Sequence, residues 1–221
     1  VDVVNNRIKY AESLLNNVLT GKIEKGRYPD NDLDDARKHF VGAWNSMFNM
    51  HPPASYKQRI ACLDNAARCS LLLAERCKTE GAEMTPEALA YAKKHLNLAE
   101  TDYLSVLRHR TGTNASITDF AEANANLGKL YEAKARIIPD AAKEYLPKAA
   151  AAYESALNLA RQEGATKPLV LAEQLRLSAQ FQKTHGDKVK GEALEKEAQT
   201  ILTSTLGKGS LQGKSETQAL D

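Results

Sequence analysis

The side chains that could carry out acid–base or metal chemistry are scattered along this sequence. None of the five histidines has a second histidine or a glutamate at the spacing that places two metal ligands on one helical face; they are His39, His51, His95, His109 and His185. Asp35 and His39 do share a helical face, but such a pair is more often a surface hydrogen bond than part of a site. The sequence therefore predicts no metal ion and no cofactor.

The cysteines fall in one predicted helix, where they follow its apolar stripe at Cys62, Cys69 and Cys77. Seven residues of helix separate the first two by about 10 Å along the axis, which is beyond the reach of a disulfide. Free cysteine is among the most buried residue types, so we expect buried, unreactive thiols. A reducing, cytoplasmic compartment is the matching expectation.

Residues 207–215 read GKGSLQGKS and look like a phosphate-binding loop. The first glycine of that template falls on Lys208, and the loop also needs a preceding strand and a following helix. A flexible polar tail is the better interpretation. Since no serine elbow or paired-cysteine motif is present either, the sequence predicts a protein that is not an enzyme.

The composition excludes two further classes. Thirty basic and 28 acidic residues give a net charge of +2, so no strong field draws the chain to nucleic acid. No run approaches the roughly 20 apolar residues of a membrane-spanning helix, and we expect no membrane insertion. Within an apolar share of 43%, alanine and leucine dominate, which favours helices.

Prolines, glycines and capping residues divide the chain into about eight helices. Pro147 would interrupt a helix, so we expect a turn before it and a new helix from about Leu146. The predicted ranges are 3–19, 33–51 after a capping cluster at 29–32, 55–80, 85 onward, 116–137, 146–164, 167–186 and 188–206. We expect one helical-repeat domain over residues 1–206 and a disordered polar tail over 207–221.

A pattern of small, large and small residues recurs in the second helix of each predicted pair, at steps of 56 and 57 residues. Its members are Ala36, Phe40, Ala43; Ala92, Leu96, Ala99; and Ala149, Tyr153, Ala156. A small residue recurs in the first helices at Ser13, Ser70, Gly128 and Ser178. A fourth, degenerate triplet starts at Ala193 or Leu194. A fixed period of this kind is typical of stacked helical repeats.

These residues resemble the tetratricopeptide repeat, most closely where Leu127, Gly128 and Tyr131 precede the third triplet. The interval between the small residue and the later alanine is 12 in that family, whereas here it is 21 to 23 in the first three pairs. The resemblance implies an all-α fold, a right-handed array of antiparallel helix pairs forming a tetratricopeptide-like α-solenoid. An irregular helical bundle is the alternative.

The resemblance also implies a concave groove that receives a protein or peptide. When the small residues of the first helices are aligned with the small residue of the tetratricopeptide motif, the groove contains Arg68, Asn126, Lys129 and Arg176. The alternative is that these residues lie on an ordinary solvated face. We therefore expect a non-catalytic scaffold or adaptor. A ligand- or peptide-responsive regulatory module of a larger protein, or an enzyme with an unrecognised site, are alternatives. The partner, the oligomeric state and any processing stay open.

Overall fold

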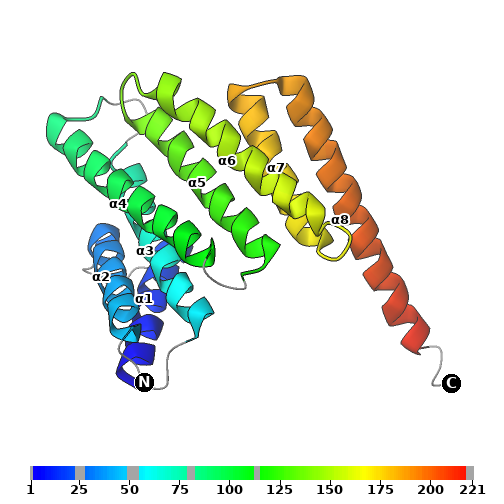
Figure 1. Ribbon diagram of the computed structural model, residues 1–221, viewed down its shortest axis with the longest axis horizontal. Coiled ribbons are helices and arrows are strands. Elements are labelled where there is room, and N and C mark those ends of the chain that lie inside the picture. The colour runs from blue at the N-terminus through cyan, green and yellow to red at the C-terminus, as the bar shows by residue number, and fades with distance from the viewer. Residues whose placement is uncertain (1, 23–27, 49–54, 79–82, 112–114, 218–221) are drawn as a thin grey trace. The chain divides into compact units, whose positions relative to one another are not determined.

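A computed structural model describes residues 2–22, 28–48, 55–78, 83–111 and 115–217, with side chains up to residue 205. The described residues form eight α-helices and no strand (Figure 1). The helices are α1 (Asp2–Thr20), α2 (Pro29–Met47), α3 (Tyr56–Arg76), α4 (Pro86–Thr111), α5 (Ile117–Ile137), α6 (Ala142–Gln162), α7 (Pro168–His185) and α8 (Lys188–Thr217). No described helix is long and apolar enough to cross a membrane. The predicted all-α class is confirmed.

Helix starts follow local capping chemistry. The backbone N–H of Gln58 donates to the Ser55 hydroxyl at 3.2 Å, and that of Ala88 donates to Thr85 at 3.2 Å. At α5, Ser116 and Asp119 satisfy each other's backbone N–H groups, as in a capping box. The predicted starts near residues 55, 85 and 116 are therefore confirmed.

The prediction that the sixth helix starts near Leu146 is wrong, because α6 begins at Ala142 and contains Pro147. Asp140 adopts a left-handed backbone with φ of 59°, which turns the chain, and the N–H of Glu144 then donates to the carbonyl of Ala141 at 3.1 Å. Pro147 is exposed near the start of the helix. It removes one backbone hydrogen bond, and the carbonyl left free can bind water.

The chain divides into two compact units. Unit one comprises Val1–Thr113 and Lys129–Tyr145, and unit two comprises Asn114–Gly128 and Leu146–Asp221. In unit one, α1 packs on α2, α2 on α3, and α3 on α4; in unit two, α7 packs on α8. Within each unit, consecutive helices run in opposite directions, as antiparallel pairs (Figure 1). The predicted single domain over 1–206 stays a prediction.

The core of each unit is formed by the positions of the repeat. All nine residues of the three triplets are at most 3% exposed. In α8, Leu194 and Ala198 are buried and Ile201 packs against them, whereas Ala193 is exposed. The fourth triplet therefore starts at Leu194. Packing of these faces accounts for most of the stability of such helices.

The small residues of the first helices have different roles. Ser70 is fully buried and accepts a hydrogen bond from Nε of Arg37 at 2.7 Å, while Nη2 of Arg37 donates to Asp102 at 3.0 Å. This network joins α2, α3 and α4. Ser13 is exposed, because the buried stripe of α1 passes through its neighbour Leu14 instead.

The predicted boundary at residue 206 does not coincide with a helix end, because the backbone of α8 continues to Thr217. Adding a residue to an existing helix costs less free energy than starting one, so a polar sequence can extend a helix that is already packed. The predicted tail thus lies partly on α8 and partly, at residues 218–221, outside the described residues.

Candidate functional site

The four residues predicted to line a groove fall in different units. Arg68 and Lys129 are exposed in unit one, whereas Asn126 is half-buried and Arg176 is exposed in unit two. Arg176 forms two hydrogen bonds to the carboxylate of Glu173 on its own helix, at 3.0 and 3.1 Å, and they raise its pKa. The structure describes no single site that contains all four, and their binding role stays a prediction.

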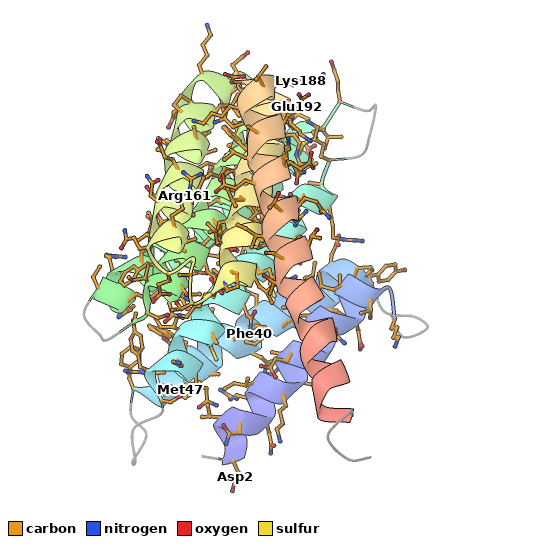
Figure 2. All side chains as sticks on the ribbon, turned by 90° about the vertical axis from the view of Figure 1, so that its right-hand side faces the viewer. Asp2, Phe40, Met47, Arg161, Lys188 and Glu192 are labelled. Atoms are coloured by element: carbon orange, nitrogen blue, oxygen red, sulfur yellow. The ribbon has the colours of Figure 1, made fainter. Side chains whose placement is uncertain are left out.

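A cleft of about 260 Å³ lies in unit one between α1 and α3, the first helices of the first two pairs. Phe40 of α2, labelled in Figure 2, also lines the cleft and is fully buried. The two walls are Asn5, Ile8, Lys9 and Glu12 on α1, and Gln58, Ala61, Cys62 and Asn65 on α3. We call this the α1/α3 cleft.

The walls of the α1/α3 cleft have the same residue spacing. Each contributes positions i, i+3, i+4 and i+7, which form one stripe along a helix. Asn5 and Gln58 meet at one end, where Nε2 of Gln58 donates to Oδ1 of Asn5 at 3.0 Å. Two antiparallel connections separate α1 from α3, so the two helices run in the same direction. Glu12 and Asn65, each seven residues further along its helix, lie toward the other end of the cleft.

Side-chain amides give the rim of the α1/α3 cleft both donors and acceptors. The hydrogen bond between Asn5 and Gln58 uses one donor and one acceptor, which leaves the Asn5 NH₂ and the Gln58 carbonyl oxygen for a ligand. Asn65 makes no side-chain hydrogen bond to any described residue. A peptide group, with one N–H and one C=O, complements such a rim.

The thiol at the bottom of the cleft is not a nucleophile. Burial, together with the negative charge of Glu12, raises the pKa of Cys62 to about 12, and burial does the same for Cys69. A nucleophilic cysteine needs a lowered pKa. Both side chains are buried, as predicted, while Cys77 is half-buried. The described residues contain no cluster of three or more His, Cys, Asp or Glu that could hold a metal ion.

The histidine and aspartate that share a face of α2 do not pair with each other. The carboxylate of Asp35 accepts a hydrogen bond from Lys38 at 3.4 Å, and the His39 ring lies edge-on to Tyr10 at 5.0 Å. Each side chain therefore has another neighbour, and the pair forms no acid–base site.

A second cleft of about 190 Å³ lies in unit two between α6 and α8, with α7 below it. Its floor is aromatic, since the rings of Tyr153 and Phe181 lie 5.4 Å apart. Arg161, seen on α6 in Figure 2, lines this cleft and forms an ion pair at 3.1 Å with Glu197 of α8. We call it the α6/α8 cleft.

The residues of the α1/α3 cleft are not among those predicted from the sequence. Asn5, Gln58 and Asn65 belong to no motif, and only the pairing of α1 with α3 brings them together. Arg68 was selected from the same helix, and it lies one turn beyond Asn65. The signal in the sequence is a polar residue at i and i+7 with an apolar residue at i+3, which occurs on both first helices, at Asn5 and Glu12 and at Gln58 and Asn65.

No family model matches the chain, and no curated protein matches it. Among solved structures, a filament titled DHF58 is 20% identical with a TM-score of 0.43, covering 91% of this chain and 93% of that one. The de novo designed helical repeat protein DHR64 is 18% identical with a TM-score of 0.42, covering 92% and 94%. Because the identities are 20% or less and the TM-scores are below 0.5, the fold class rests on the chain's own helices and their packing. The tetratricopeptide resemblance stays a prediction.

Proposed function

We propose that the protein is a non-catalytic scaffold or adaptor that binds an extended peptide segment of a partner protein in the α1/α3 cleft. The cleft itself is the observation that carries this proposal. It combines an apolar floor with a rim of amide side chains, and it lies on the first helices of the repeat pairs. Helical repeats offer such surfaces for recognition without any chemistry of their own.

The amides support a peptide over a charged ligand. Main-chain hydrogen bonds supply affinity for an extended segment regardless of its sequence, and neighbouring pockets supply specificity. Lys9 and Glu12 are the charged residues of the cleft, and their charges oppose each other. The three free thiols support a reducing, cytoplasmic compartment for the adaptor.

A peptide-display selection on the immobilised protein tests this proposal. Selected peptides should bind wild type and lose about tenfold or more in affinity to Gln58→Ala and to Asn65→Ala, because each variant removes a hydrogen-bonding amide. Gln180→Ala is the matched control, since it removes an exposed amide from α7. Equal affinity for all variants would remove the α1/α3 cleft as the site.

The α6/α8 cleft favours a second function, a ligand-responsive regulatory module. Its aromatic floor and the polar groups of Ser178, Gln182 and Lys190 suit an amphipathic molecule smaller than a nucleotide, because the volume lies below the range of drug-sized ligands. A thermal-shift screen against metabolites would test it, because a ligand that binds the folded state raises the melting temperature. Failure of every compound to raise that temperature, or an equal rise in a Ser178→Leu variant, would count against this function.

A further inference from the structure

The floor of the α1/α3 cleft is made of hydrocarbon and one neutral thiol. Ile8 at the base of the α1 wall and Phe40 contribute carbon atoms, and Cys62 at the base of the α3 wall keeps its proton because burial raises the pKa of its thiol. Nothing in this floor can neutralise a charged group. A charge placed there would lose its hydration without compensation.

The size of the α1/α3 cleft limits its occupant to one large side chain. Its volume of about 260 Å³ is below the range of about 300–1,000 Å³ typical of drug-sized ligands. A cofactor or nucleotide therefore does not fit. One branched aliphatic side chain, with the backbone on either side of it, does.

The length of the cleft matches a short stretch of extended chain. Gln58 and Asn65 lie seven residues apart on α3, which is about 10.5 Å along the helix axis. Three residues of an extended peptide span about 10 Å. Amides at the two ends of the cleft can therefore meet peptide groups on both sides of one anchoring residue.

The charged residues of the cleft favour neither an acidic nor a basic anchor. Lys9 and Glu12 lie one turn apart on the α1 wall, and the α3 wall is uncharged. A charged anchor of either sign is attracted by one of these residues and repelled by the other, so the pair gives neither sign a net advantage. Binding that depends on neither charge is expected to vary little with salt.

We infer that the α1/α3 cleft selects an extended segment with a single branched aliphatic anchor, such as leucine, flanked by peptide groups bound to Asn5, Gln58 and Asn65. This inference rests on the proposed peptide binding and adds the class of peptide. Specificity comes from the apolar floor, and orientation comes from the amide rim.

The test is an NMR titration of the ¹⁵N-labelled full chain with capped peptides Ser-Thr-Ser-Xaa-Ser-Thr-Ser. With leucine at Xaa, the side-chain NH₂ signals of Asn5, Gln58 and Asn65 should shift and saturate. With alanine, affinity should fall by about tenfold, since less apolar surface is buried. The peptides with aspartate or lysine at Xaa should bind no better than the alanine peptide. The affinity of the leucine peptide should change little up to about 0.5 M salt.

Two cleft-filling variants and one control complete the experiment. Ala61→Leu and the larger Ala61→Trp should weaken the leucine peptide progressively, because Ala61 is an exposed helical position at the cleft. Ser13→Trp adds an indole to an exposed α1 position outside the cleft and should leave binding unchanged. Circular dichroism confirms that each variant is folded.

The outcomes separate the two proposals. If every peptide shifts the signals of the three amides, and the affinity does not depend on the residue at Xaa, the proposed aliphatic anchor is wrong. The proposed peptide binding then remains in place. Tighter binding of the aspartate or lysine peptide also overturns the anchor. If no peptide, including those from the display selection, shifts the three amides, both proposals fail.

Discussion

Gly128 of α5 lies directly against the ring of Tyr153 of α6, so closely that an added Cβ would stand 2.8 Å from Cε1 of the tyrosine. Both residues belong to unit two and to the repeat pattern. The small residue of one helix thus makes room for the large residue of the next. In this pair the contact gives a physical reason for the spacing of the repeat residues, whereas Ser13 and Ser70 occupy the corresponding positions with other roles.

Gly128→Ala should therefore destabilise the protein, although alanine normally favours a helix over glycine by about 1 kcal/mol. The clash with Tyr153 should outweigh this helix preference, so that the substitution lowers the free energy of unfolding by about 1–3 kcal/mol. Urea denaturation measures the change. Gly42→Ala is the matched control, because its Cβ would meet only the end of the Arg7 side chain, at 3.3 Å. Equal effects of the two substitutions would contradict this assignment.

The buried ammonium of Lys134 gives a second prediction. Its side chain is 1% exposed and forms an ion pair with Glu100, donates to Asn97 at 3.2 Å, and lies 5.1 Å from the ring of Tyr145. Glu100→Ala should cost about 3 kcal/mol in unfolding free energy, because it leaves a buried charge without its counter-ion. Adding Lys134→Met should recover most of that loss. No recovery in the double variant would argue against a buried, charged lysine.

His95 predicts a loss of stability in acid. The ring is 4% exposed, its Nδ1 has no hydrogen-bond partner among the described residues, and burial together with the nearby Lys94 and Arg37 lowers its pKa, against the opposing charge of Asp34. The unfolded chain takes up the proton at a higher pH than the folded one. Unfolding free energy should therefore fall as pH drops below about 6.5 and stop falling below the lowered pKa.

Urea titrations between neutral and mildly acidic pH, on wild type and His95→Gln, measure this contribution. The difference in unfolding free energy between wild type and His95→Gln should shrink with falling pH, because wild type loses the stability that a neutral, buried imidazole contributes. Parallel curves of unfolding free energy against pH for the two proteins would show that the pKa of His95 does not differ between the folded and unfolded chain.

The three thiols should react at different rates. Cys62 and Cys69 are buried, and their pKa values are raised to about 12, whereas Cys77 is half-buried and its thiol donates to the carbonyl of Leu73 at 3.3 Å. A disulfide reagent on the native protein should modify Cys77 in a fast phase and the other two only on unfolding. Cys77→Ser should abolish the fast phase; if it persists, another thiol is accessible.

Arg68 gives a test of the groove predicted from the sequence. It lies one turn beyond Asn65 on α3, so Arg68→Glu should change the affinity of peptides long enough to extend past the α1/α3 cleft. Arg176→Glu should leave that affinity unchanged, because Arg176 lies in unit two and is held by Glu173. Fluorescence anisotropy with a selected peptide measures both. An effect of Arg176→Glu equal to that of Arg68→Glu would favour the original four-residue groove.

The sequence by itself determined the helices and their buried faces. Capping residues such as Ser55 and Thr85 act within a few positions of their own chain, and the small and large residues of the triplets mark the core because helical periodicity is local. The start of α6 predicted at Leu146 from the same local signals is wrong. One exposed proline costs less than the helical turn that the chain gains before it.

The candidate site was decided only by tertiary structure. Asn5 and Gln58 are 53 residues apart, and nothing local distinguishes them from other exposed amides until α1 and α3 lie side by side. The same holds for Arg37, Ser70 and Asp102, whose network joins three helices. Periodicity fixes which face of a helix is buried, but the identity of the neighbouring helix and its register depend on packing over long sequence separations.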